Sequence, residues 1–389
     1  MACSLAAVGQ VLPGTSSPDP GSGLKVDVSL VPVHVIVRDA QGRAVGNLSR
    51  DDFQVFDQGK PQVIQQFSAE RTGGQVPNVA GTAGSTASPE ARFTIYLFDD
   101  LHLQHEDLVR AREAADRQIA HLSPLPWEHA ALFTTSGQSR ADFDAGTEKL
   151  RAALALEPQG RPSASDCPHM TYYMADLIDE KGDREALSIA ADEIVSCAFD
   201  GNRKSRREAS QMASAVAREK TAIGKAETAN SLGILKRLIK AMSSAPGRKL
   251  IVLVSPGFFI SDAQAQAEIT ELAARSDVNV SALDPRGLLP MADLNASRMI
   301  YRSASQAEDA ALLEALTDAT GGLFFHNNND VEDGFRRIAA VPEYSYTLAF
   351  SPQGLKLDGH FHKLKVTVND GVNLTVQARK GYYAPKNKP

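Results

Sequence analysis

The two ends of the chain share one hydrophobic pattern. Residues 24–39 alternate apolar and polar positions and are rich in valine, which predicts a strand with one buried face. The same alternation recurs in shorter segments, namely 53–56, 63–67, 344–350, 363–368 and 374–379. The strands of one end are too few for an independent core, so we predict that residues 24–70 and 343–386 pair into one small β-sandwich.

The middle of the chain follows a different pattern. The apolar runs 93–98 (FTIYLF) and 249–254 (KLIVLV) are typical of strands buried on both faces of a parallel sheet. Segments with helical spacing of apolar residues follow them, as in 103–121. We therefore predict that residues 92–342 form an α/β domain with a doubly wound, mostly parallel sheet. Residues 166–245 contain no convincing strand and are predicted to be a helical insertion.

Two segments lack large apolar residues and are predicted to connect or precede the domains. Residues 1–23 are expected to be a disordered leader, and residues 71–91 a flexible linker. The first 14 residues have no basic region, so they do not form a signal peptide by themselves. No apolar run reaches the roughly 18 residues of a membrane helix, so no membrane span is expected.

Length and charge narrow the class of protein. A chain of 389 residues favours two domains. Its formal net charge of −6 gives no electrostatic reason to bind nucleic acid or anionic lipid. Cys167 and Cys197 are candidates for one disulfide, which would indicate an oxidising compartment; two unrelated thiols are the alternative. No CxxC or HxxxH accompanies them, so they are not a zinc motif.

Several phrases of the sequence carry a family likeness. The segments FTIYLFDD, KLIVLVSPGF, NVSALDPRGL and TGGLFFHNNNDVEDGFRRI resemble the VWA-related domain proteins (von Willebrand factor A-like) of the acidobacterial type. The predicted sandwich strands at both ends resemble the flanking regions of those proteins, so the likeness covers residues 24–386. The resemblance implies a VWA/Rossmann-like sheet in an exported protein that binds a ligand or serves as a scaffold.

The resemblance also implies a metal-ion-dependent adhesion site, and this chain departs from its pattern. VWA domains commonly hold a divalent cation with a DxSxS motif after the first strand and an Asp after the fourth. Asp99 matches the first Asp, but Leu101 and Leu103 stand at the two Ser positions and Pro256 at the second Asp. Leucine and proline side chains cannot ligate a cation, so the site is degenerate. We expect no cofactor, or at most weak binding of Mg²⁺ or Mn²⁺.

Polar residues at the predicted strand ends form a candidate ligand-binding rim. This rim comprises Asp99, Asp100, His102, Ser255 and Asp284. If a metal binds here, its ligands would be Asp99, Asp100 and His102, a mixed set that suits Zn²⁺ or Mn²⁺. The alternative is that Asp100 and His102 only cap the following helix. Ser255 lies in VSPGF rather than GxSxG and has no evident triad partners, so no catalytic residue is expected.

Three functions agree with these features. The first is a non-enzymatic binding or scaffold protein, secreted, periplasmic or in the cell envelope, whose partner is an unknown protein or surface polymer. The second is a metal-dependent hydrolase-like enzyme built on the Asp99, Asp100 and His102 cluster. The third is a structural component of an envelope assembly. The helical insertion either carries the partner surface or packs as a lid without a partner.

Overall fold

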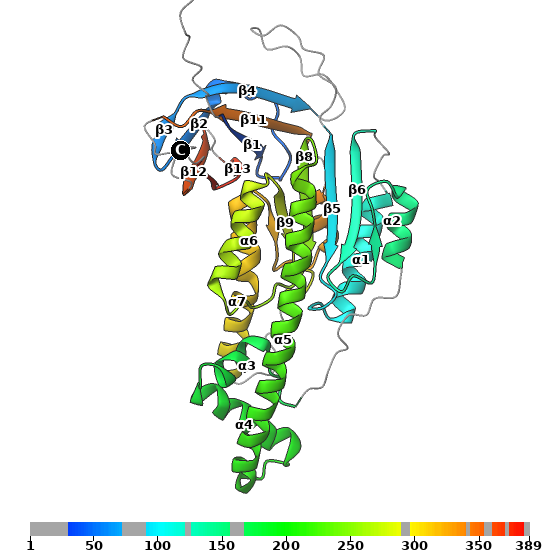
Figure 1. Cartoon of the computed structure of the whole chain (residues 1–389), viewed down its shortest axis with the longest axis vertical. Coiled ribbons are helices and arrows are strands. Elements are labelled where there is room, and N and C mark those ends of the chain that lie inside the picture. The colour runs from blue at the N-terminus through cyan, green and yellow to red at the C-terminus, as the bar shows by residue number, and fades with distance from the viewer. Residues whose placement is uncertain are drawn as a thin grey trace, which may run out of the picture.

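The protein has three parts arranged in a row (Figure 1): a β-sandwich, an α/β core and a helical insertion. The computed structural model describes residues 30–71, 91–120, 126–155, 167–288, 296–339, 343–353, 360–369 and 373–384. The predicted leader, 1–23, and residues 72–90 of the predicted linker lie outside these ranges. No helix of the described part is long and apolar enough to cross a membrane.

The α/β core contains one six-stranded sheet, in the order β10-β9-β8-β5-β6-β7. Its strands are β5 (Arg92–Phe98), β6 (Glu128–Thr134), β7 (Arg140–Ala141), β8 (Arg248–Val254), β9 (Asn279–Leu283) and β10 (Phe324–Phe325). All neighbours are parallel except β7, which runs antiparallel to β6 at the edge. The expectation of a mixed α/β fold with a mostly parallel sheet is confirmed.

Helices cover both faces of this sheet. One face packs against α1 (His105–Ala120), α2 (Gly146–Ala155) and α8 (Val331–Ala339). The other face packs against α5 (Arg206–Ser243), α6 (Ala263–Arg275) and α7 (Ala296–Thr320). In β5, Tyr96 and Phe98 belong to the first core and Ile95 and Leu97 to the second. Burial on both faces explains why residues 95–98 of the strand are apolar on both sides.

The β-sandwich is built from both ends of the chain. One antiparallel sheet has the order β13-β1-β11-β4 and the other the order β14-β12-β2-β3. The strands are β1 (Val31–Arg38), β2 (Phe53–Asp57), β3 (Lys60–Gln62), β4 (Ile64–Arg71), β11 (Tyr344–Phe350), β12 (Phe361–Val368), β13 (Thr375–Ala378) and β14 (Gly381–Tyr383). A 3₁₀ turn, η1 (Arg50–Asp52), precedes β2. The inward residues of β1, such as Val33 and Val35, share one core with Tyr346 and Leu348 of β11.

The insertion has a core of its own. It comprises α3 (Tyr172–Asp179), α4 (Arg184–Ala198), the 3₁₀ turn η2 (Arg203–Ser205) and the first half of α5. Ala209, Ala213 and Ala217 of α5 are fully buried against these helices. The second half of α5 packs on the main sheet through Leu235 and Ile239. One helix of 38 residues therefore connects the insertion to the sheet (Figure 1).

A disulfide joins Cys167 and Cys197, so it ties the segment before α3 to the last turn of α4. We predict that replacing both cysteines with Ser lowers the free energy of unfolding of the insertion by about 3–4 kcal/mol, the loop-closure value for 30 residues. Chemical denaturation followed by hydrogen exchange would measure this. Cys3→Ser is the control, and equal protection of α3 and α4 in both variants would contradict the prediction.

Candidate functional site

Three parallel strands end at one point of the sheet and carry the candidate site there. The chain leaves β5 toward β6 on one side and returns as β8 on the other, so the strand order reverses between β5 and β8. Such a point opens a crevice at the carboxyl ends of the strands. Asp99 follows β5, Thr135 follows β6 and Ser255 follows β8. The Asp99 amide donates to the Val254 carbonyl at 2.9 Å, which keeps these ends in register.

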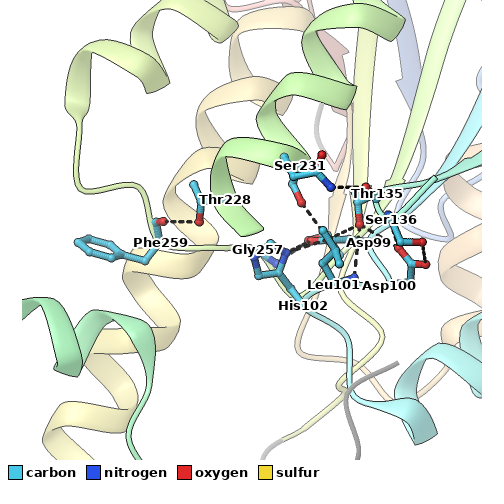
Figure 2. Close-up of polar contacts among 12 residues, drawn as sticks. Asp99, Asp100, Leu101, His102, Thr135, Ser136, Thr228, Ser231, Gly257 and Phe259 are labelled. Atoms are coloured by element: carbon cyan, nitrogen blue, oxygen red, sulfur yellow. Dashed lines mark hydrogen bonds and ion pairs between the residues drawn. The ribbon is translucent and has the colours of Figure 1, made fainter. Parts of the chain in front are cut away.

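The centre of the site is the carboxylate of Asp99, which is completely buried. Thr135 Oγ1 donates to Oδ1 at 2.9 Å, and Ser255 Oγ donates to Oδ2 at 2.6 Å. Ser231 Oγ, from α5, lies 3.4 Å from Oδ1. The Nδ1 atom of His102 lies 2.8 Å from Oδ1 and 2.9 Å from Oδ2, so it faces both oxygens (Figure 2). Asp99 thus joins three strand ends, one helix and the imidazole of His102.

These contacts keep Asp99 ionised. Burial alone would raise the pKa of the carboxyl group. The charge of His102 and the donors on His102, Ser255 and Thr135 outweigh burial, and the pKa of Asp99 lies below its usual value. An ionised carboxylate only accepts hydrogen bonds, so the proton of the shared contact resides on His102 Nδ1. The site therefore contains a buried carboxylate–imidazole pair at neutral pH.

Asp100 makes a second, separate set of contacts. Its Oδ1 accepts from the Ser136 amide at 2.8 Å and from Thr135 Oγ1 at 3.0 Å, and its Oδ2 accepts from Ser136 Oγ at 2.5 Å. These partners belong to the loop after β6, and His102 contacts Asp99 in turn. The alternative that Asp100 and His102 cap α1 is therefore wrong. Asp100 fixes the neighbouring loop instead.

The residues present do not fit the cation of a metal-ion-dependent adhesion site. Leu103 is fully buried in the core beneath α1, where it cannot be replaced by a ligating hydroxyl without losing that packing. The Nδ1 atom of His102 occupies the side of Asp99 that a cation would need. Across the described ranges, no three His, Cys, Asp or Glu side chains form a group suited to a metal ion. The set that Asp99, Asp100 and His102 would form if a metal bound here is not assembled in the described ranges.

Asp284 serves to position an arginine. It follows β9 and holds Arg286, whose Nη2 lies 2.7 Å from Oδ2 and whose Nε lies 3.0 Å from Oδ1. The same Nη2 donates to the Pro256 carbonyl at 2.7 Å. This fork-to-fork pairing fixes the guanidinium in one plane. Asp284 thereby directs the positive charge of Arg286 toward the space in front of the strand ends.

That space is a cleft of about 900 Å³ between the rim, the insertion and α7. His102, Phe258 and Arg286 line it from the strand ends, and Tyr172 and Ile223 line it from the insertion. Of the five predicted rim residues, only His102 lines the cleft. Asp99 and Ser255 are fully buried, which corrects the expectation that they face a ligand. Instead, Asp99 contacts His102, which lines the cleft, and Ser255 donates to Asp99.

Helix α5 attaches the insertion to the rim by polar contacts that the sequence did not reveal. Thr228 Oγ1 donates to the Phe259 carbonyl at 3.2 Å (Figure 2). Asn230 Nδ2 donates to the Thr135 carbonyl at 2.9 Å. A β-carbon on Gly224 would lie 2.3 Å from the Tyr172 ring, so only glycine lets α3 approach this closely. These contacts connect the wall of the cleft to the strand ends.

Several residues of the site escaped the sequence analysis. Thr135 and Ser136 had a signal, because the hydroxyl residues of TTS directly follow an apolar strand, as Asp99 does. Ser231 had none, because it lies within a polar helix far from any predicted strand end. Arg286 occurs in the sequence analysis only within the segment NVSALDPRGL, and its pairing with Asp284 depends on the local backbone.

Asp309, from α7, is a further cleft residue with unusual ionisation. Burial raises its pKa to about 6, although Arg286, His102 and a hydrogen bond from the Phe259 backbone oppose the shift. A β-carbon on Gly257 would lie only 2.0 Å from the backbone carbonyl oxygen of Asp309, so the turn after β8 packs tightly against α7. The cleft thus contains a carboxyl group that titrates near neutral pH.

We predict that Asp99→Asn lowers the free energy of unfolding at pH 7 by about 3 kcal/mol, because it removes the buried charge to which Thr135, Ser255 and His102 hydrogen-bond. Because the folded pKa of Asp99 is lowered, its contribution is complete above about pH 4 and is lost as the pH falls through the folded pKa. The difference between wild type and variant should therefore shrink below about pH 4 in urea denaturation. The exposed pair residue Asp142 gives the control Asp142→Asn, which should change little. Parallel curves for wild type and Asp99→Asn at all pH values would contradict this.

We predict that Asp309→Asn changes the free energy of unfolding at pH 7 in the opposite direction, so that it rises. The raised folded pKa means that the native state binds the proton more tightly, so wild-type stability falls as the pH rises from about 4 to about 6. The variant escapes this loss and should be more stable at pH 7, by up to about 3 kcal/mol at about 1.4 kcal/mol per pKa unit. Urea denaturation between pH 4 and 8 measures it. Asp318→Asn, on the same helix but exposed, is the control, and identical pH profiles for wild type and Asp309→Asn would refute the prediction.

Comparisons with known proteins give no family for this chain. No protein-family model matches it, and no curated protein matches it. The likeness to the VWA-related proteins therefore depends on the sequence phrases, and any function has to be argued from the geometry of the cleft and of the Asp99–His102 pair.

Proposed function

We propose that this protein is a VWA-like, non-enzymatic binding module that holds a segment of a protein partner in the cleft between the strand ends and the helical insertion, without a cation. The observation that carries the proposal is the position of His102. Its Nδ1 contacts both oxygens of Asp99, at 2.8 and 2.9 Å, and its ring borders the cleft. Under this proposal, the imidazole replaces the metal ion that the resemblance to VWA domains implies beside Asp99.

The composition of the cleft favours a polypeptide. Its walls combine aromatic rings, among them Tyr172, Phe258 and Tyr301, with charged groups of both signs. Aromatic residues and arginine dominate the energetics of protein–protein contacts. A volume of about 900 Å³ accommodates several side chains of a partner. Arg286 would meet a carboxylate, and Asp309 would meet a cationic or amide group.

The strand order supports the VWA-like part of the proposal. We number the strand positions of the core sheet from the edge strand β7 to the edge strand β10. The chain then fills the third position first, followed by the second, the first, the fourth, the fifth and the sixth. That is the classic doubly wound order, in which ligands bind where the order reverses. The disulfide between Cys167 and Cys197 supports an exported protein, secreted, periplasmic or in the cell envelope.

The same contacts favour binding over catalysis. A nucleophile needs access to its substrate and an adjacent base. Ser255 Oγ is buried and donates to Asp99, and it also accepts from the Gly257 amide at 3.0 Å. A metal-dependent hydrolase would need carboxylate oxygens that are free to ligate its ion. Both oxygens of Asp99 already accept hydrogen bonds from protein groups. The function proposed is therefore recognition.

The test uses two substitutions on one helix. Ile223 and Met212 are both exposed apolar residues of α5, but only Ile223 lines the cleft. We expect immobilised wild-type protein and Met212→Arg to retain the same partner from a cell-envelope extract, and Ile223→Arg to lose at least 90% of it as measured by quantitative mass spectrometry. Addition of EDTA should leave retention unchanged, because no cation takes part.

Two outcomes would reject the proposal. Equal retention by Ile223→Arg and wild type would place the partner outside the cleft. Loss of retention in EDTA, restored by Mg²⁺ or Mn²⁺, would show that a cation is required and would reject the role assigned to His102.

A further inference from the structure

The β-sandwich meets the first residues of β5 and β8 at the opposite end of the sheet (Figure 1). A second cavity lies at this junction. Its volume is about 140 Å³, and about 15 Å³ suffices for one water molecule. Strands β1, β5 and β8 and helices α6 and α8 contribute residues to its wall. The cavity is therefore a product of the junction between the two domains.

The charge of this cavity is strongly one-sided. Six cationic side chains line it against one carboxylate, that of Asp277. The cationic residues are Arg38, Arg92, Arg248, Lys249, Arg337 and Arg379. Arg92 and Arg248 are paired in register on adjacent parallel strands, so their side chains begin at neighbouring positions of the sheet. Like charges this close repel each other unless something separates or neutralises them.

Partners inside the protein satisfy only part of this charge. Arg248 contacts Glu70 at 2.5 Å, and Arg337 contacts Asp333 at 2.5 Å. Arg38 donates to the Gly42 carbonyl at 2.9 Å, and among the described residues neither Arg38 nor Arg92 forms an ion pair within 4 Å.

Arg379 is the most telling member of the set. Its Nε is buried and has no hydrogen-bond partner in the described structure. The nearest carboxylate, that of Asp277, lies 4.0 Å from Nη1. A buried guanidinium N–H without an acceptor is costly, and native proteins usually supply one.

Ionisation of the set agrees with this geometry. Burial lowers the pKa of Arg92, and the charge of Arg248 lowers it further, while Glu128 opposes the shift. Burial and the charge of Arg337 lower the pKa of Arg38. A dianion in the cavity would offset both burial and the repulsion between neighbouring arginines, because it adds negative charge and accepts hydrogen bonds.

We propose that the junction cavity is a binding site for a doubly charged tetrahedral oxyanion, a phosphate or sulfate group. Guanidinium groups match such oxyanions with paired N–H donors. The group could be a free ion or the end of a phosphate monoester, and both present the same oxygens. Because the ligand would contact β1, β5, β8 and the residue after β13, it would bind both domains and stabilise their junction.

The experiment is isothermal titration calorimetry of the full chain with inorganic phosphate, sulfate and phenyl phosphate at constant ionic strength in chloride. We expect at least one of the three to bind, with a Kd at least tenfold higher for Arg92→Gln and for Arg38→Gln. The control Arg140→Gln removes an exposed arginine of the distant edge strand β7, and its Kd should stay within twofold of wild type. Phosphate should also raise the Tm of wild type but not of the two cavity variants.

The arms of the experiment separate the sources of the group. Tighter binding of phenyl phosphate indicates a monoester ligand, and tighter binding of inorganic phosphate or sulfate indicates the free ion. Should Arg92→Gln fail to fold, as judged by circular dichroism, Arg38→Gln decides, because Arg38 lies at the end of its strand. Absence of heat and of a Tm shift with all three probes, or unchanged affinity in the cavity variants, overturns the proposal. The cavity is remote from the cleft, so this result does not depend on the function proposed for the cleft.

Discussion

The structure around the strand ends depends on the buried negative charge of Asp99. A carboxylate without water must be neutralised or hydrogen-bonded, and here Thr135, Ser255, Ser231 and His102 supply the donors. Each donor comes from a different segment of the chain. The requirement of one charge therefore fixes the relative positions of three strand ends, helix α5 and the imidazole that borders the cleft.

The proposed replacement of a cation by the His102 imidazole has consequences for recognition. A metal at this position would bring a strong positive charge and open coordination positions to a partner's carboxylate. His102 satisfies Asp99 internally and leaves the cleft to act through shape, aromatic contacts and the two charges of Arg286 and Asp309. In the proposed binding mode the insertion would contribute to specificity, because α5 links the insertion to the rim through Ser231, Thr228 and Asn230.

The two cavities lie at opposite ends of one sheet and differ in character. The cleft has both signs of charge and an aromatic wall, whereas the junction cavity is almost wholly cationic. A formal net charge of −6 conceals the second feature completely. Composition gives no electrostatic reason to expect an extended basic surface, and it does not describe a local cluster. An anion at the junction would stabilise the contact between sandwich and core, while the cleft would remain free for a partner.

The sequence by itself determined the mostly parallel sheet, because strands buried on both faces are almost continuously apolar, as in 93–98 and 249–254. It also marked Asp99 and His102, since polar residues that follow such strands meet at one edge. Only the tertiary structure decided what these residues do. Ser231 lies 132 positions from Asp99 and the cationic residues of the junction extend from 38 to 379, so their contacts arise from long-range packing. Local patterns record the burial of a segment, and they carry no information about which distant side chain will satisfy a buried charge.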